Sequence, residues 1–124
     1  MGASEETVVR RVCELWASRD AGGMVEVFAK DGVYDNVPAR KPFHGREALR
    51  AWLEQVFDKM WVEIELLHIM SDGEWVLSER LDTHVVGDRR LPLPVMNTSR
   101  VVDGEISLWR DYYDQKTVVD LGMA

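Results

Sequence analysis

The sequence predicts an α+β domain in which helices pack against one face of a curved antiparallel or mixed sheet. In the first half of the chain, apolar residues recur at three- and four-residue spacing, which is typical of amphipathic helices. Beyond Trp61 the spacing changes to two, which is typical of strands. Short turn signals join these later segments and favour antiparallel pairing, since a parallel neighbour needs a longer crossover. With 124 residues, the chain fits one domain over residues 1–124.

Two helices are expected ahead of the first strand. Ser4 is the expected N-cap of the first helix, whose apolar stripe lies within Val8–Trp16. Two glutamates in its first turn suit the positive end of the helix dipole. The second helix is shorter, with its apolar residues within Met24–Phe28. It is expected to end near Gly32, because glycine suits a terminating turn.

A short strand, a loop and a long helix follow. Val33–Val37 contains β-branched and aromatic residues in alternation, which predicts a strand. Pro38 should end this strand, because proline cannot donate a hydrogen bond to the ladder. The loop is expected to run through His44. Between Gly45 and Met60 apolar residues recur at the strongest helical spacing in the chain, which predicts the third helix.

Four strands are expected to complete the domain. The turns between them contain Gly and Asp, and Asp103-Gly104 is a hairpin signal. Pro92 and Pro94 fit a strand that begins at a sheet edge or at a bulge. The expected strands run from Val62 to the turn at 71–74, then over Trp75–Val86, Leu91–Val102 and Ile106–Tyr113.

The composition argues against two classes of partner and site. Fifteen Lys and Arg stand against 22 Asp and Glu, for a net charge of −7. Nucleic acid is therefore not expected as a partner, since binding its phosphates requires a concentrated positive face. Cys13 is the only cysteine, so the chain can form neither an internal disulfide nor a thiolate cluster. Cys13 should behave as a small buried apolar residue of the first helix.

The motifs of metal sites, cofactor sites and targeting segments are also missing from the sequence. His44, His68 and His84 do not show metal-ligand spacing, and no glycine-rich nucleotide loop is present. We therefore expect neither a metal nor a cofactor. The amino terminus has acidic residues where a secretory signal carries positive charge, and no apolar run could span a bilayer. A cytoplasmic protein without a membrane partner is the expectation.

Three charged residues in the predicted strands could form an acid–base site. Arg80 and Asp82 share one face of the strand 75–86, and Asp111 lies between Trp109 and Tyr113 on one face of the last strand. An arginine between two carboxylates can hold both, while their environments push the two carboxyl pKa values apart. One carboxyl would then serve as an acid and the other as a base. If these faces are exposed, the same residues are ordinary solvated charges.

Tyr34 and Asn36 form a second candidate pair. They lie two residues apart in the first predicted strand, so a phenol and an amide project to the same side. With a carboxylate, they could hold a water molecule and aim its lone pair at an electrophile. Alternatively, the two side chains make structural hydrogen bonds only.

Three segments resemble the limonene-epoxide hydrolase family in sequence, order and spacing: Val33–Pro38, Ser78–Asp82 and Ser107–Asp114. The similarity runs from the first helix to Asp114, nearly the whole chain. It implies a cone-shaped fold of the nuclear-transport-factor-two-like superfamily, in which three to four helices and the curved sheet enclose a deep apolar pocket. It also implies a cofactor-free enzyme that works as a homodimer.

The resemblance implies a one-step conversion of an epoxide to a vicinal diol. Asp111 would be the general base on a water also held by Tyr34 and Asn36. Asp82, kept protonated, would donate its proton to the epoxide oxygen, and Arg80 would bridge the two carboxyls. Candidates for the lining of the substrate pocket are Trp52, Leu53, Phe57, Leu77, Leu93, Val95, Met96 and Tyr113.

Two other functions use the same kind of fold. The first is a non-catalytic cone protein that holds a small hydrophobic ligand such as a steroid or lipid, since one fold hosts unrelated functions. The second is an isomerase of the ketosteroid type, which combines a tyrosine with an acid. The isomerase leaves Arg80 between two carboxylates without a role. An epoxide hydrolase acting on a small apolar or alicyclic epoxide is therefore the leading hypothesis.

Overall fold

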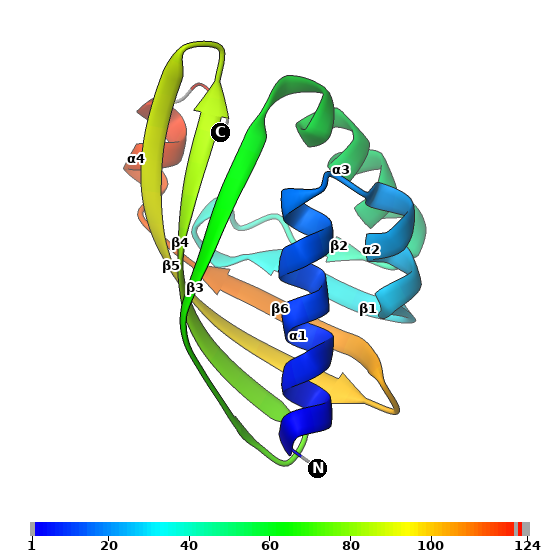
Figure 1. Cartoon of the computed structure of the whole chain (residues 1–124). Coiled ribbons are helices and arrows are strands. Elements are labelled where there is room, and N and C mark those ends of the chain that lie inside the picture. The colour runs from blue at the N-terminus through cyan, green and yellow to red at the C-terminus, as the bar shows by residue number, and fades with distance from the viewer. Residues whose placement is uncertain (1, 121, 123–124) are drawn as a thin grey trace.

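In the part of the chain that the computed structural model describes, residues 2–120 and 122, six strands form one strongly curved sheet (Figure 1). Across the sheet the order is β2-β1-β6-β5-β4-β3, and all neighbours are antiparallel except β1 and β6, which are parallel. The expected α+β class with a mixed sheet is confirmed. The strands are β1 (Phe28–Asn36), β2 (Phe43–His44), β3 (Trp61–Asp72), β4 (Trp75–Val86), β5 (Arg89–Val102) and β6 (Glu105–Tyr112).

Three helices lie on the concave side of the sheet, and a short fourth helix lies near one end of β4 and β5 (Figure 1). These are α1 (Gly2–Ala17), α2 (Ala21–Val27), α3 (Arg46–Lys59) and α4 (Gln115–Asp120), with a 3₁₀ turn, η1, at Val37–Ala39. The apolar stripes predicted for α1 and α3 form the core between helices and sheet. Val12 and Leu53, one from each stripe, are fully buried there.

The two N-terminal helices have different ends from those predicted. Helix α1 begins at Gly2, so Ser4 lies within the helix and is not its N-cap. Helix α2 ends at Val27, where Phe28 turns extended and pairs with Ile106 on β6. Pairing in the sheet therefore outweighed the helical spacing of residues 24–28. Gly32 lies in β1 and does not end the helix; a Cβ there would come within 2.8 Å of the Ile106 carbonyl oxygen.

Three further details differ from the expectation. The segment around His44, expected as a loop, contains β2, which pairs with Val33 and Tyr34 of β1. Strand β5 begins at Arg89, because only Gly87-Asp88 form the turn before it. The sequence pattern did not predict α4. The position of Pro92 and Pro94 was predicted correctly: they lie in the part of β5 before Met96, where pairing with β6 begins.

Register places polar residues of three strands on the concave face. Positions 76, 78, 80 and 82 of β4 are buried, as the predicted alternation requires, while Trp75 and Leu77 are exposed. Every buried polar or charged residue within the described ranges belongs to β4, β5 or β6. These residues are Ser78, Arg80, Asp82, Asn97, Ser99 and Asp111.

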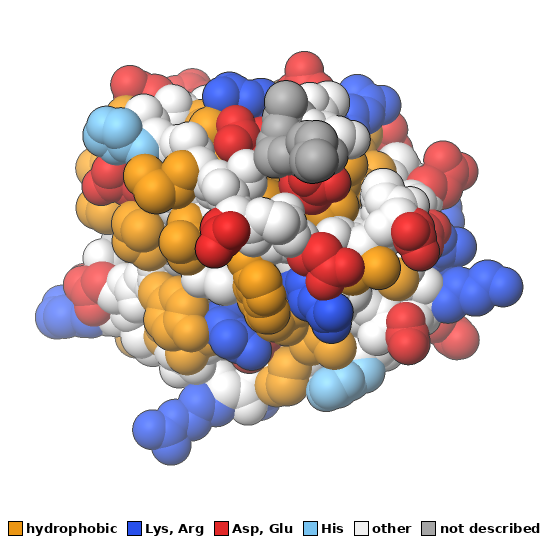
Figure 2. Space-filling view, turned by 90° about the horizontal axis from the view of Figure 1, so that it is seen from below, with side chains coloured by type: hydrophobic (Ala, Val, Ile, Leu, Met, Phe, Trp, Pro, Cys, Tyr) orange, Lys and Arg blue, Asp and Glu red, His pale blue; other side chains and the backbone are white. Residues whose placement is uncertain are grey.

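The surface carries mixed charges. On the face shown in Figure 2, Lys and Arg side chains are scattered among Asp and Glu and do not gather into one patch. This distribution fits the net charge of −7 and gives that face no positive surface for phosphate groups. Among the described helices, we find none that combines the length and apolar character needed to cross a membrane.

Candidate active site

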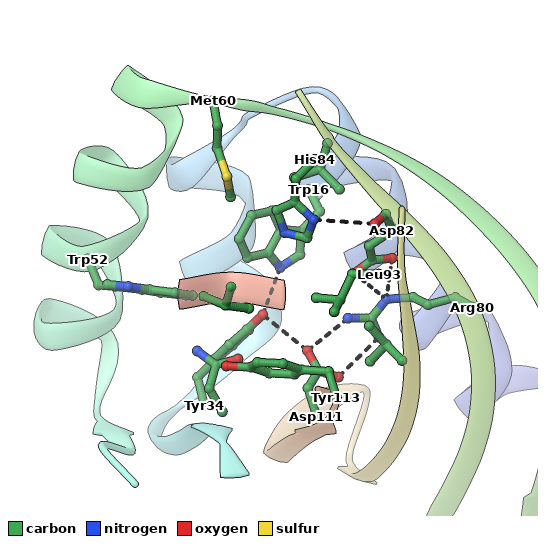
Figure 3. A pocket seen from close by; sticks show the side chains of 14 residues that line it. Trp16, Tyr34, Trp52, Met60, Arg80, Asp82, His84, Leu93, Asp111 and Tyr113 are labelled. Atoms are coloured by element: carbon green, nitrogen blue, oxygen red, sulfur yellow. Dashed lines mark hydrogen bonds and ion pairs between the residues drawn. The ribbon is translucent and has the colours of Figure 1, made fainter. Parts of the chain in front are cut away.

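A cavity of about 80 Å³ opens between the helices and the concave face of the sheet (Figure 3). One wall is aromatic and aliphatic, and the other carries the buried charged residues. Its lining comes from α1, β1, α3, β3, β4, β5, the end of β6 and α4. The lining residues are Trp16, Tyr34, Asn36, Trp52, Met60, Val62, Arg80, Asp82, His84, Leu93, Val95, Asp111, Tyr113 and Val118.

The guanidinium of Arg80 joins two carboxyl groups in this cavity. Its Nε donates to both oxygens of Asp82, at 2.9 and 3.0 Å. Its Nη1 and Nη2 reach across β5 to Asp111 on β6, donating to Oδ1 at 3.1 Å and to Oδ2 at 2.8 Å. All three residues are at most 7% exposed. They are therefore a buried cluster, and the alternative of a solvated charge pair does not apply to Arg80 and Asp82.

Burial and charge balance act differently on the members of this cluster. Burial raises the pKa of Asp82 above its ordinary value, with Asp111 adding to the rise, although Arg80 acts in the opposite direction. Burial would lower the pKa of Arg80, but Asp111 and Asp82 outweigh it, so that pKa lies well above its ordinary value. Arg80 is thus a permanent cation that can balance one of the two carboxylates. The neutral form is favoured at Asp82.

Asp111 is surrounded by donors. Besides Arg80, Asn97 Nδ2 donates to Oδ1 at 2.8 Å, and Trp109 Nε1 donates to Oδ2 at 3.0 Å. The hydroxyl of Tyr34 lies 3.5 Å from Oδ2, a long hydrogen bond. Donors aimed at a carboxylate stabilise its negative charge. Of the two carboxyl groups, Asp111 is therefore the one whose surroundings favour the ionised form.

Tyr34 and Asn36 lie beside Asp111 because β1 runs parallel to β6. The register pairs Tyr34 with Trp109 and Asn36 with Asp111. The Tyr34 hydroxyl accepts a hydrogen bond from Trp16 Nε1 at 3.0 Å, and Figure 3 shows it aimed from there toward Asp111. Burial raises the pKa of Tyr34 well above its ordinary value, so the group remains a phenol and keeps its donor. Asn36 also lines the cavity.

Half of the predicted pocket residues line this cavity, and half do not. Trp52, Leu93, Val95 and Tyr113 do. Leu53 and Phe57 of α3 are buried in the core and do not line the cavity. Leu77 and Met96 are 46% and 49% exposed on the outer face of the sheet, because side chains alternate and their neighbours in β4 and β5 point inward. Leu77 and Met96 therefore point away from a cavity on the concave face.

Several lining residues were not predicted as site residues. Trp16 and Met60 were expected only as parts of the apolar helical segments that they end, and Val118 lies on the unpredicted α4. His84 shares the face of Arg80 and Asp82 by strict alternation, so its position could have been found from the sequence. Its Nδ1 lies 3.3 Å from the backbone oxygen of Asp82, and burial lowers its pKa, which favours the neutral ring.

Other reactive groups do not contribute a second site. Within residues 2–120 and 122, no group of three or more His, Cys, Asp or Glu side chains is arranged to hold a metal ion. Cys13 is buried, and burial raises the pKa of its thiol to about 11. A thiol with such a pKa is not a nucleophile at neutral pH. It packs in the core, as expected from the sequence.

Comparison with known proteins places this geometry in a family. The family model described as "Limonene-1,2-epoxide hydrolase catalytic domain" matches residues 4–123. The epoxide hydrolase EphG of Mycobacterium tuberculosis is 36% identical over 84 residues, which are 68% of this chain and 56% of that protein. The match therefore spans little more than half the length of that relative.

Solved structures show the same architecture. An LEH-like epoxide hydrolase of M. tuberculosis superposes with a TM-score of 0.86 at 26% identity, over 96% of this chain and 89% of that one. An NTF2-like protein of unknown function from Burkholderia pseudomallei superposes equally well, with a TM-score of 0.86. Its identity is only 17%, over 98% of each chain, so this second likeness concerns the fold alone.

Proposed function

The chain belongs to the limonene-1,2-epoxide hydrolase family, and on that premise we propose that it hydrolyses a small apolar or alicyclic epoxide to a vicinal diol in one step. The observation that carries this proposal is the Arg80 guanidinium held between two buried carboxyl groups at the cavity wall, 2.9 Å from Asp82 and 2.8 Å from Asp111. Such a group can supply an acid and a base to the two sides of one strained ring.

Asp111 is the general base in this proposal. A water molecule donates one hydrogen bond to Asp111 and is oriented by the Tyr34 hydroxyl and the Asn36 amide. As its oxygen bonds to an epoxide carbon, its proton passes to Asp111. All three side chains line the cavity, and β1 and β6 bring them together in register.

Asp82 is the general acid. When the ring C–O bond breaks, its electron pair goes to the epoxide oxygen, which takes the proton of Asp82. Water thus supplies one hydroxyl of the diol, and the ring oxygen becomes the other. One turnover leaves Asp111 protonated and Asp82 ionised. Arg80 contacts both carboxyls and so balances the single negative charge before and after the reaction.

The charge count explains why one carboxyl keeps a proton. One buried guanidinium balances one carboxylate, and a second buried negative charge would be unpaired, which is costly. The raised pKa of Asp82 puts the proton on the carboxyl with the fewer donors. We propose no cofactor, because the strained ring needs only a push on water and a pull on oxygen.

The cavity supports a small substrate. Its volume of about 80 Å³ lies below the roughly 300–1,000 Å³ common for sites of drug-sized ligands. Trp16, Trp52, Met60, Leu93 and Val95 supply apolar walls, which suit an alicyclic or alkyl group. This volume favours a small substrate over a steroid or lipid-like ligand. An isomerase of the ketosteroid type would also leave the Arg80 bridge without a role.

We further propose a homodimer in the cytoplasm. Met70, Leu77, Met96 and Tyr112 form an outer patch on the convex face of the sheet and are each 44–62% exposed. Met70 pairs with Leu77, and Met96 pairs with Tyr112, so the patch consists of one apolar pair on β3 and β4 and another on β5 and β6. An apolar patch of this kind favours burial against a second copy.

A single turnover in ¹⁸O-labelled water tests the mechanism. With enzyme in excess over a small alicyclic epoxide, the first diol formed should carry the label in one hydroxyl. Unlabelled diol would mean that a carboxylate attacked the ring, and would overturn the one-step reaction. If none of a series of epoxides of graded size yields diol with folded protein, the hydrolase proposal itself fails.

A further inference from the structure

Asn97 of β5 lies between the strands that carry the two carboxyl groups and is 1% exposed. The register places it directly opposite Asp111. One hydrogen of its amide Nδ2 is directed at Asp111 Oδ1, at 2.8 Å, and the other at the backbone oxygen of Arg110, at 3.2 Å. Both N–H groups of the amide are therefore committed to the strand that carries Asp111.

Ser99 fixes the orientation of this amide. Its hydroxyl donates to Asn97 Oδ1 at 2.6 Å, and Ser99 is fully buried. A flipped amide would place Oδ1 against two acceptors, the Asp111 carboxylate and the Arg110 carbonyl, so the flip is unfavourable, and in the orientation present Ser99 donates to Oδ1. The Asn97 side chain therefore presents a donor to Asp111 permanently.

The opposite end of β5 is apolar. Asp82 is paired in register with Leu93, and Arg80 with Val95, and both β5 side chains are buried. The side chain of Asp82 accepts hydrogen bonds from Arg80 alone among the described residues. Along one strand, the inward side chains thus change from apolar beside Asp82 to polar beside Asp111.

We propose that Asn97, oriented by Ser99, is a positioning residue that holds the negative charge on Asp111 and so leaves the proton of the pair on Asp82. A donor stabilises the ionised form of the carboxyl it contacts, whereas apolar surroundings favour the protonated form. Strand β5 would thereby assign the roles of base and acid. The kinetic consequence of this inference rests on the proposed function, but the position of the proton does not.

The titratable and charged groups around Asp111 do not make this choice alone, and Trp109 Nε1 adds to the effect of Asn97 on the other carboxylate oxygen. The titratable and charged groups that interact with Asp111 are Arg80 and Asp82 on β4, Tyr34 on β1, Cys13 on α1 and Tyr113 after β6. Burial raises the pKa of Cys13 to about 11 and that of Tyr113 to about 12, and the pKa of Tyr34 is also raised. These three stay neutral at neutral pH. Arg80 contacts both carboxyls and therefore does not by itself decide between them.

The test is a pH titration of the two carboxyl carbons by ¹³C NMR in protein with labelled aspartate. Asp82→Asn and Asp111→Asn identify the two resonances. In the wild type, Asp111 should ionise at a lower pH than Asp82. In Asn97→Leu and in Asn97→Ala, the pH at which Asp111 ionises should rise by about one unit, the size expected for losing one hydrogen bond to a charged group. The acid limb of kcat/KM should move by the same amount.

Control variants separate this effect from a general loss of packing or folding. Thr98→Val changes the neighbouring residue, whose side chain lies on the opposite face of β5, and should leave both titrations unchanged. Ser99→Ala should shift Asp111 in the same direction by less, and Ser99→Thr, which retains the hydroxyl, should restore the wild-type value. Thermal unfolding confirms that each variant is folded.

Three results would overturn the inference. These are a wild-type protein in which Asp111 ionises at higher pH than Asp82, a folded Asn97 variant with unshifted Asp111, and an equal shift in Thr98→Val. The two Asn97 variants disturb packing differently, so either one suffices if the other fails to fold. The titration needs no substrate. A chain that shows the expected shift but hydrolyses no epoxide would refute the proposed function and leave this assignment standing.

Discussion

Trp16 of α1 donates its indole N–H to the hydroxyl of Tyr34 on β1, at 3.0 Å, inside the core. The two rings also touch, with centroids 6.3 Å apart. Because the indole occupies a lone pair of the phenol oxygen, the phenol hydrogen is turned toward the side of Asp111. The first helix therefore helps to orient the hydroxyl proposed to hold the attacking water.

Trp16→Phe should lower kcat while the fold persists. Phenylalanine retains much of the packing but lacks the N–H, so the Tyr34 hydroxyl loses the bond that orients it. The expected loss is roughly fivefold to tenfold in kcat, equivalent to one neutral hydrogen bond. Steady-state kinetics with a small alicyclic epoxide would measure it. Trp75→Phe, on the outer face of β4, is the matched control and should keep the wild-type rate. Equal rates for both variants would remove Trp16 from the mechanism.

The two aspartates should differ in their effect on stability, although the proposed mechanism requires both. Asp111→Asn removes the carboxylate that Arg80, Asn97 and Trp109 contact, and Asp82 must then ionise in its buried surroundings to balance Arg80, so the free energy of unfolding should fall by about 1.5–3 kcal/mol. Asp82→Asn replaces a carboxyl that is already neutral, so the free energy of unfolding at pH 7 should equal or exceed that of the wild type. Urea denaturation measures both.

Each of these variants should reduce diol formation by at least about 100-fold, since each removes the proposed general acid or the proposed general base. The stability result and the rate result are independent. If Asp82→Asn were the more destabilising of the two, Asp82 would be the anion and the assigned roles would be reversed. Turnover surviving in both variants would exclude the acid–base mechanism.

Activity should follow a bell-shaped pH profile. Asp111 must be ionised to accept a proton and sets the acid limb, while Asp82 must be protonated to donate one and sets the alkaline limb. Because burial raises the pKa of Asp82 above its ordinary value of 3.8, activity persists above that value and falls as pH rises through the raised pKa. The logarithm of kcat/KM plotted against pH would show both limbs. Asp88→Asn, in an exposed turn, should shift neither limb.

The raised pKa of Asp82 should also make the free energy of unfolding depend on pH. Below pH 3.8 Asp82 is protonated in both the folded and the unfolded chain, so it does not affect the balance. Between 3.8 and the raised pKa of the folded state, the unfolded chain releases a proton that the folded chain retains, so stability falls as pH rises. The Asp82→Asn variant has no carboxyl at this position, so its stability lacks this dependence on pH. The difference in unfolding free energy, variant minus wild type, should therefore grow across that window, and a constant difference would contradict the raised pKa.

Strand alternation made much of the site predictable from the sequence. The residues at positions 80, 82 and 84 share a face by period two, and the structure places all three at the cavity. Leu77 was misplaced because apolar character alone suggested a pocket, although the same alternation puts it on the other face. Asn97 was missed because its role depends on the register between β5 and β6, which places it opposite Asp111, and the strand pattern alone does not set that register. The parallel pairing of β1 with β6, which brings Tyr34 and Asn36 to the site, is a long-range contact that no local pattern indicates.

The boundaries near Phe28 show the same limitation for the fold. Residues 24–28 match helical spacing, yet Phe28 pairs with Ile106, a partner far along the chain. Local propensity is a weak signal where such tertiary pairing decides the backbone conformation. The long helix α3 was predicted well, because its own apolar stripe suffices to define it.

Leu77→Lys combined with Met96→Lys should convert the proposed dimer into a monomer. Both side chains belong to the outer patch, and buried lysines would face each other without partners. Sedimentation velocity at micromolar protein should show roughly half the wild-type mass. Val119→Lys, on the exposed side of α4, adds a charge elsewhere and should leave the mass unchanged. A monomeric wild type would refute the dimer directly.

Val95→Ala should widen the substrate range. Val95 lines the cavity from β5, and its truncation adds space at the apolar wall beside Arg80. The ratio of kcat/KM for a larger epoxide to that for a smaller one should rise on the order of tenfold, the scale at which a pocket discriminates one or two methylenes.

Val101→Ala is the matched control, because Val101 is equally buried on the same strand but does not line the cavity. It should reduce stability through the same loss of packing and leave the ratio unchanged. A ratio that changes equally in both variants would show that loosened packing, and not the shape of this cavity, selects the substrate.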